Sequence, residues 1–333
     1  MSAAASDAAV LDVRGLCTRF HTREGVLPVV DGVSFTLGRG KVLGLVGESG
    51  SGKTVTGFSI MRLIDPPGRI EAGEVRFKGD DLTQLAPKAL RELRGDRIAM
   101  IFQDPMATLN PVLRVQEQMT EAVHAHRRMS GREACALAVA ALRMVGIPSP
   151  EERLRAYPHQ MSGGMRQRVA IAIALLHKPD LIIADEPTTA LDVTIQAQIL
   201  DLLVGLQKET GMALILVTHD MGVVAETAER VIVQYAGQQV ERQRVADLFE
   251  TPRHPYTSAL LAALPERSTG GRLPSISGVV PGLHDRPKGC LFNPRCRFAS
   301  EACRTIEPPR MGHDLGEALC HYPLQGAVTE ASS

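Results

Sequence analysis

The stretch GESGSGKT, residues 47–54, carries the residue types that hold phosphate, with the spacing of a glycine, four residues, then Gly-Lys-Thr. Such glycines let the backbone curl so that N–H groups face an anion. The lysine then reaches the β and γ phosphates of a nucleoside triphosphate, and the threonine hydroxyl binds Mg²⁺. The alternative is a glycine-rich turn with a chance lysine. We expect phosphate contacts from Gly47, Glu48, Ser49, Gly50, Ser51, Gly52, Lys53 and Thr54.

An acidic pair closes the apolar run LIIADE, residues 181–186. Asp185 could hold Mg²⁺ through water, and Glu186 could orient or deprotonate an attacking water. The alternative is an acidic pair that caps the end of a strand. Because the phosphate loop and this pair occur together, we expect NTP hydrolysis.

Four of the six cysteines lie near the end of the chain, at Cys290, Cys296, Cys303 and Cys320. Five, six and sixteen residues separate them, which differs from the paired spacing of common zinc sites and from small ferredoxins. Four thiolates suit tetrahedral Zn²⁺ or an iron–sulfur cluster. Ligation by His313 or His321 instead would favour zinc. Four unlinked thiols are the remaining alternative.

Short apolar runs bounded by turns predict buried strands that carry the phosphate loop and the acidic pair. Strands are expected at 12–20, 33–40, 41–46, 74–82, 97–103, 180–186 and 213–220, and helices within 115–146, 164–178 and 192–210. Strands that alternate with helices favour an α/β fold with a mostly parallel sheet.

Composition narrows the class of protein. The 333 residues are 44% hydrophobic and carry no net charge, and tryptophan is absent. A basic or aromatic platform for nucleic acid is therefore not expected. No apolar run reaches the ~18 residues of a membrane helix, and MSAAASDAAV does not resemble a secretory signal.

The stretch MSGGMRQR, residues 161–168, resembles the signature of the ATP-binding cassette (ABC) ATPases. Gln103 after a strand, ALD at 190–192 and THD at 218–220 follow the order of that family. The resemblance implies a P-loop NTPase fold of the ABC type: a mostly parallel core sheet, an antiparallel β subdomain and a helical subdomain at about 105–165. We expect a loose tail at 1–10, the ATPase at 11–250, and a Cys-rich extension at 251–333.

The resemblance also implies roles for further residues. Ser162, Gly163, Gly164 and Met165 would contact the ATP of an opposite ATPase subunit, although Met165 stands where the family usually has glutamine and cannot donate that hydrogen bond. Gln103 would contact Mg²⁺ and the attacking water, His219 the γ-phosphate, and Asp192 would couple the two sites. Phe20 is the candidate to stack on adenine. The structural alternatives are a helix cap for Ser162, polar strand ends for Gln103 and His219, and core packing for Phe20.

MIFQDPMATLNPVLRVQEQM (100–119), TPRHPYTSALLAALP (251–265) and the cysteine tail resemble the peptide and nickel importer branch. The resemblance implies uptake of peptides or a related solute, driven by ATP and Mg²⁺, with a [4Fe–4S] cluster in the tail. It implies two permease subunits, a second and paralogous ATPase, a solute-binding protein, and a place at the cytoplasmic face of the membrane. The alternatives are a soluble ABC ATPase of translation or DNA repair, a nickel importer, and a redox-responsive regulator.

The extension is expected to serve a structural or redox-sensing role and to take no part in ATP chemistry. Its arginines, including Arg295, Arg297, Arg304 and Arg310, are expected to be solvated.

Overall fold

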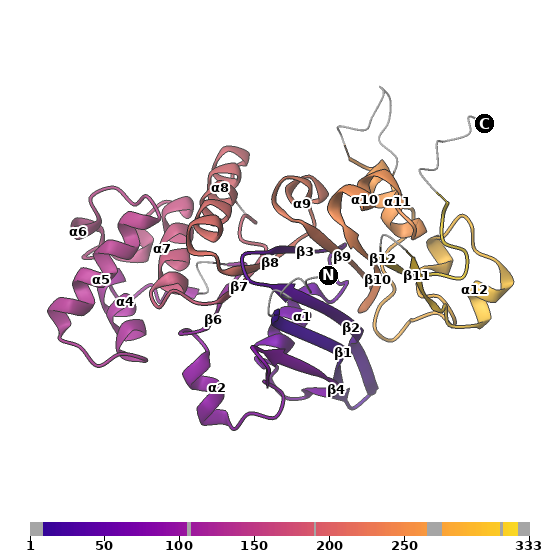
Figure 1. Cartoon of the computed structure of the whole chain (residues 1–333), viewed down its shortest axis with the longest axis horizontal. Helices are drawn as coiled ribbons and strands as arrows, with labels where there is room; N and C mark the ends of the chain where they lie inside the picture. The colour runs from indigo at the N-terminus through magenta and orange to yellow at the C-terminus, as the bar shows by residue number, and fades with distance from the viewer. Residues whose placement is uncertain (1–8, 105–107, 190, 265–274, 314–315, 326–333) are drawn as a thin grey trace, which may run out of the picture. The chain divides into compact units, whose positions relative to one another are not determined.

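The computed structural model describes residues 9–104, 108–189, 191–264, 275–313 and 316–325. These residues form two compact units (Figure 1). One unit is built mainly from residues 84–215, and the other from residues 11–37, 42–83 and 216–333. Most of the expected tail at 1–10, and Ala190 of the ALD triplet, lie outside the described residues. The domain boundaries expected from the sequence remain predictions.

The first unit, residues 84–215, has a short parallel sheet and a group of helices. Strands β6 (Ile98–Ile101) and β7 (Leu181–Asp185) pair in parallel, and β8 (Ala213–Thr218) begins beside β7. All residues of β6 and β7 are buried. The helices of this unit are α2 (Pro87–Leu93), α4 (Val115–His124), α5 (Gly131–Met144), α6 (Pro150–Arg153), η1 (Pro158–Gln160), α7 (Gly163–Leu175) and α8 (Val193–Thr210).

Local sequence signals set the ends of these helices. Ser130 and Glu133 form a capping box at the start of α5, and Asp192 caps α8 by accepting from the Ile195 N–H at 3.0 Å. Gly211 ends α8 with a φ of 68°, in the left-handed region that favours glycine. Apolar residues at helical spacing, such as Val115, Met119 and Val123, bury one face of α4.

The second unit is built on a mixed sheet in the order β5-β4-β1-β2-β10-β9-β3. The β3–β9 pair is parallel, β2 meets β10 in parallel, and β1–β4, β4–β5 and β9–β10 are antiparallel. The strands are β1 (Ala9–Thr22), β2 (Gly25–Gly38), β3 (Val42–Val46), β4 (Gly68–Phe77), β5 (Asp80–Asp81), β9 (Arg230–Tyr235) and β10 (Gln238–Arg244).

The cysteine-rich extension belongs to this second unit. It contributes β11 (Arg310–His313) and β12 (Gly316–Leu319), and β12 pairs antiparallel with both β11 and β10. The extension is therefore hydrogen-bonded to the sheet that carries the phosphate loop. The helices of this unit are α1 (Lys53–Ile60), α9 (Met221–Thr227), α10 (Val245–Glu250), α11 (Pro255–Ala262), η3 (Asn293–Arg295) and α12 (Glu301–Thr305).

An aromatic cluster forms part of the core of this unit. Tyr235 of β9, Tyr256 of α11 and Phe292 have ring centroids 4.7–5.4 Å apart and are at most 3% exposed. Such pairs add specific ring-to-ring contacts to apolar burial. The contacts of the Tyr235 ring with the rings of Tyr256 and Phe292 join the sheet to the extension. Within the described residues, no helix is both long and apolar enough to cross a membrane.

Candidate functional site

The phosphate loop lies between buried strand β3 and helix α1, as the sequence predicts. Gly52, the residue before α1, has a φ of 94°, and a Cβ there would lie 2.6 Å from the Val29 carbonyl oxygen. Only glycine fits this position, because other residues meet both backbone strain and a steric clash. The loop therefore turns tightly into the start of α1, and the N-terminus of a helix attracts anions.

Lys53 is held inside the loop. Its ammonium group donates to the carbonyl oxygens of Gly47 at 2.8 Å and Glu48 at 3.1 Å, and the residue is only 4% exposed. Ser51 is buried, and its hydroxyl oxygen has no hydrogen-bond partner among the described residues. A buried, positively charged group beside an unsatisfied hydroxyl fits an anion that brings acceptor oxygens.

The acidic pair belongs to the other unit. Asp185 ends β7 and is 2% exposed. Glu186 follows with a φ of 43°, a conformation that costs energy for a residue with a side chain. The Glu186 carboxylate accepts from the Gln103 side-chain amide at 3.2 Å and from the Thr189 hydroxyl at 2.9 Å. Gln103 and Glu186, both expected to act on the attacking water, therefore meet.

The signature residues lie at the start of α7. Ser162 is the N-cap, and its hydroxyl accepts from the Met165 N–H at 3.3 Å. A Cβ at Gly164 would lie 2.8 Å from the Ile195 side chain, so this glycine permits close approach of α7 to α8. In the single chain, Ser162 and Asp192 thus both cap helices, while Ser162 stays exposed.

His219 follows β8 and is exposed, and the next residue, Asp220, caps α9 by accepting from the Gly222 N–H at 2.8 Å. Phe20 lies on β1 opposite Gly68 of β4, and a Cβ at Gly68 would come within 2.8 Å of its ring. The Phe20 ring therefore packs over a glycine and stays partly exposed.

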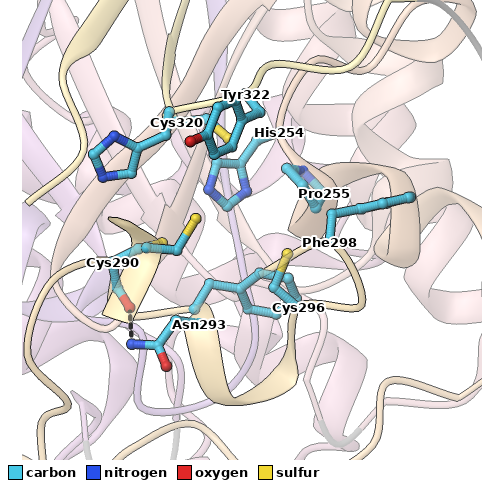
Figure 2. A pocket seen from close by; sticks show the side chains of 11 residues that line it. His254, Pro255, Cys290, Asn293, Cys296, Phe298, Cys320 and Tyr322 are labelled. Carbon is cyan, nitrogen blue, oxygen red and sulfur yellow. Dashed lines mark hydrogen bonds between the residues drawn. The ribbon is translucent and has the colours of Figure 1, made fainter. Parts of the chain in front are cut away.

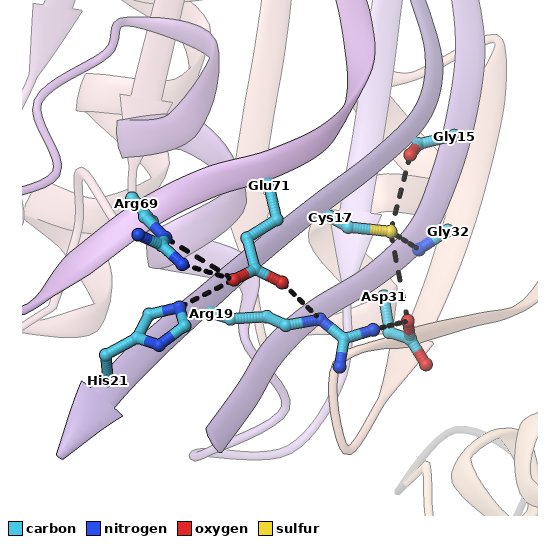
Figure 3. A network of polar contacts seen from close by, with 8 residues as sticks. All are labelled: Gly15, Cys17, Arg19, His21, Asp31, Gly32, Arg69 and Glu71. Carbon is cyan, nitrogen blue, oxygen red and sulfur yellow. Dashed lines mark hydrogen bonds and ion pairs between the residues drawn. The ribbon is translucent and has the colours of Figure 1, made fainter. Parts of the chain in front are cut away.

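A network of charged side chains lies on β1 and β4, the strands that carry Phe20 and Gly68 (Figure 3). Glu71 of β4 accepts from His21 at 2.6 Å and from Arg69 at 3.1 Å, and pairs with Arg19 at 3.2 Å. Hydrogen bonds from Arg69 and His21 hold the pKa of Glu71 below its usual value. Because side chains alternate along a strand, Arg19 and His21 point away from the face of Phe20.

The four C-terminal cysteines line one small cavity of about 20 Å³, together with His254, His321 and Tyr322 (Figure 2). Burial raises the pKa of Cys290 and of Cys320 to about 11 each, and raises the pKa of Cys296. A metal would have to displace these protons, because thiolates are the ligands. In the part of the chain that the structure describes, no three cysteine, histidine or acidic side chains are arranged as a metal site.

His321 is not free to approach a metal without rearrangement, since its Nε2 contacts the Ile306 carbonyl oxygen at 3.0 Å. The side chain of His313 lies outside the described residues. The structure therefore brings the four thiols to one cavity but does not hold them in ligand geometry.

Two further residues contact the phosphate loop and were not expected from the sequence. Tyr256 of α11 accepts a hydrogen bond from the Glu48 N–H at 2.9 Å. Arg295 pairs with the Glu48 carboxylate at 2.7 Å, and its side chain is 4% exposed. The expectation that Arg295 is solvated is wrong. Its place between cysteines gave no sign of an acidic partner 247 positions earlier in the chain.

The chain is similar to known proteins along almost its whole length. Residues 30–189 match the family model of the ABC transporter, and residues 240–303 match the C-terminal region of oligopeptide/dipeptide transporters. A dipeptide transport ATP-binding protein, DppD, of Haemophilus influenzae is 52% identical over 95% of this chain and 96% of its own length. DppD of Escherichia coli is 51% identical over 96% of this chain and 98% of its own.

This chain belongs to the ABC transporter ATPases, in the oligopeptide and dipeptide branch. A probable peptide ABC transporter ATP-binding protein of Sinorhizobium fredii is 54% identical over 90% of each chain. A solved dimeric ATP-binding cassette, bound to ADP and phosphate in a post-hydrolysis state, aligns with a TM-score of 0.63 and 30% identity over 71% of this chain and 98% of its own. The expected ABC ATPase fold is confirmed, and ATP with Mg²⁺ is the expected substrate of an ABC ATPase.

Proposed function

We propose that this ABC ATPase binds and hydrolyses ATP to drive uptake of dipeptides or oligopeptides through a membrane transporter. The observation that carries the proposal is the match along almost the whole chain, including the C-terminal region, to dipeptide transport ATP-binding proteins. The solute itself would be chosen by other subunits, because this chain supplies the nucleotide chemistry.

The proposed chemistry divides among the residues described above. Lys53 and the N–H groups of residues 47–54 bind the β and γ phosphates, and Thr54 and Asp185 hold Mg²⁺. Glu186 orients or deprotonates the attacking water, with Gln103 hydrogen-bonded to its carboxylate. His219 contacts the γ-phosphate, and Phe20 stacks on adenine.

We propose a head-to-tail pair of ATPases beneath two permease subunits, at the cytoplasmic face of the membrane. Ser162, Gly163, Gly164 and Met165 would then contact ATP held by the opposite ATPase, and Asp192 would couple the two sites. The N-terminus of α7 supports this role, because helix starts attract anions. The opposite ATPase would be a paralogue, and a solute-binding protein would deliver the peptide.

The four thiols are proposed to hold a [4Fe–4S] cluster, with Zn²⁺ as the alternative. Their convergence on one cavity supports a shared ligand, while the cavity of about 20 Å³ has room for little more than one water-sized body. Loading a cluster would thus require Cys290, Cys296, Cys303 and Cys320 to move apart. Anaerobic purification with metal and sulfide analysis tests this: about four iron and four sulfide per chain indicate the cluster, and zinc without sulfide indicates the alternative.

A transport experiment tests the main proposal. Cells that lack this chain are expected to lose uptake of a labelled dipeptide and to regain it with the intact chain but not with Lys53→Ala. Retained dipeptide uptake with lost nickel uptake would contradict the peptide assignment. ATP hydrolysis without any effect on uptake would favour a soluble ABC ATPase.

A further inference from the structure

Glu48, the second residue of the phosphate loop, is held at both its main chain and its side chain by the C-terminal extension. Its N–H donates to the Tyr256 hydroxyl at 2.9 Å. Its two carboxylate oxygens accept from the two terminal nitrogens of Arg295 at 2.7 and 3.0 Å. This bidentate geometry fixes both distance and orientation.

Arg295 is itself fixed in place. Its Nε donates to the Ser277 carbonyl oxygen at 2.9 Å, and its guanidinium lies 5.7 Å from the centre of the Tyr235 ring. Burial acts to lower the pKa of Arg295, but hydrogen bonds to Glu48 and Tyr235 outweigh it and raise the pKa. The buried side chain therefore carries a positive charge at any usable pH.

The same turn connects Arg295 to the aromatic cluster and the cysteine cavity. Helix η3 ends at Arg295, directly before Cys296 and three residues after Phe292, which packs on Tyr235 and Tyr256. The side chain of Asn293 donates to the Cys290 carbonyl oxygen at 2.8 Å and stabilises this turn. The position of the guanidinium is thus determined by packing rather than by solvent.

A carboxylate in a loop that binds a triphosphate disfavours binding, because the negative charges of the carboxylate and the phosphates repel each other at short range. We propose that Arg295 is a positioning residue for ATP: it neutralises Glu48 and, together with Tyr256, holds the start of the loop in the shape that receives phosphate. The proposal rests on the phosphate-binding role given above to residues 47–54. The extension thereby contributes to ATP affinity, contrary to the expectation that it takes no part in ATP chemistry.

The test compares ATP binding and hydrolysis by the full chain with Arg295→Met, Glu48→Gln and the double variant. The fluorescent analogue TNP-ATP reports binding, and phosphate release gives kcat and KM. Arg295→Met is expected to raise the KM for ATP about tenfold or more, with a smaller change in kcat, because it leaves the Glu48 carboxylate unpaired in the loop that binds the phosphates. Glu48→Gln in the same chain removes that carboxylate and is expected to restore KM to within about threefold of the original value.

The rescue separates positioning from a merely structural role. If Arg295 only kept the extension folded, Glu48→Gln would not restore the KM of the Arg295→Met variant, and the proposal would be wrong. An unchanged KM in Arg295→Met would overturn it as well. Arg297→Met is the matched control, because Arg297 is two residues away, is exposed, and lies over the Phe298 ring.

If Arg295→Met does not fold, Arg295→Lys takes its place, since lysine keeps the charge but not the bidentate geometry; a rise of about threefold in KM that Glu48→Gln removes is then expected. If the unsubstituted chain does not bind TNP-ATP while it is folded, the proposed function fails, and the failure is distinguishable from an unchanged KM in the variant.

Discussion

The side-chain amide of Gln103 donates to the Glu186 carboxylate across 3.2 Å, although the two residues are 83 positions apart in the chain. Thr189 donates to the same carboxylate oxygen at 2.9 Å, so Glu186 is oriented from two sides. These two hydrogen bonds and the left-handed backbone of Glu186 fix its carboxylate at the end of the buried parallel strand β7.

Glu186→Gln is expected to lower kcat for ATP hydrolysis by about 10²–10⁴-fold, the usual contribution of a general base, and to leave ATP binding nearly unchanged. Glutamine keeps the shape and can still contact Gln103, but it cannot accept a proton. Phosphate release and TNP-ATP titration measure the two effects. Glu209→Gln, on the exposed end of α8, is the control and should behave as the original chain. Equal loss of binding and hydrolysis would contradict this role.

Lys53→Ala is expected to weaken ATP binding by at least about tenfold, because a buried cation that faces phosphate is lost. The substitution also removes the hydrogen bonds to the Gly47 and Glu48 carbonyl oxygens. Titration with TNP-ATP measures the affinity, and circular dichroism checks the fold. Lys88→Ala on α2 is the control, since Lys88 is exposed and outside the phosphate loop. Unchanged affinity in the Lys53 variant would show that phosphate binds elsewhere.

Gly52→Ala is expected to destabilise the chain by about 1–3 kcal/mol and to reduce ATP binding. An alanine here would take a φ of 94° and place its Cβ 2.6 Å from the Val29 carbonyl oxygen. Chemical denaturation gives the free energy of unfolding. Gly131→Ala serves as the comparison, since Gly131 starts α5 with open space around it and should be neutral or slightly stabilising. A Gly52 variant as stable as the Gly131 variant would disprove the close approach.

The burial of His177 predicts that the free energy of unfolding depends on pH. His177 is 6% exposed, its Nε2 contacts the Ala122 carbonyl oxygen at 3.0 Å, and burial lowers its pKa. The folded state therefore binds a proton less readily than the unfolded state, and stability falls as pH drops below about 6.5. One such group contributes at most about 1.4 kcal/mol per pH unit.

His177→Gln keeps a donor for the Ala122 carbonyl oxygen and removes the titration. Between pH 7.5 and 5.5 its free energy of unfolding is expected to fall less steeply than that of the original chain. His284→Gln, at an exposed position, should leave the slope unchanged. Equal slopes for the His177 variant and the original chain would mean that the pKa of His177 is the same in the folded and unfolded states.

The parts of the fold that depend on local apolar pattern could be predicted from the sequence. Strands β3, β6, β7 and β8 lie within the expected ranges, because each is a short buried run between turn residues. We expected strand β2 at 33–40, but it begins at Gly25. Its first residues include Gly25 and Pro28, which are typical of turns, so the sequence did not indicate a strand there. Pairing within the sheet extends these residues.

Strand β10 shows why the rest could not be predicted. Its sequence QQVERQR is polar and reads as solvated, yet Gln239, Glu241 and Gln243 are at most 1% exposed. Glu241 is satisfied by the N–H groups of Arg253 at 2.7 Å and His254 at 2.9 Å. These partners lie 12 and 13 positions later, beyond α10, and no periodicity in the sequence reveals them. The burial of Arg295 against Glu48 was missed for the same reason.

The pairing of Glu48 with Arg295 also determines when the phosphate loop is completed during synthesis. The phosphate loop leaves the ribosome early, whereas its buried counter-charge lies 247 positions later. At about 5–20 residues per second, the growing chain carries an uncompensated Glu48 for roughly 10–50 seconds. During that interval the loop lacks the partner that favours ATP. The order of translation thus delays tight nucleotide binding until the C-terminal extension has folded onto the sheet.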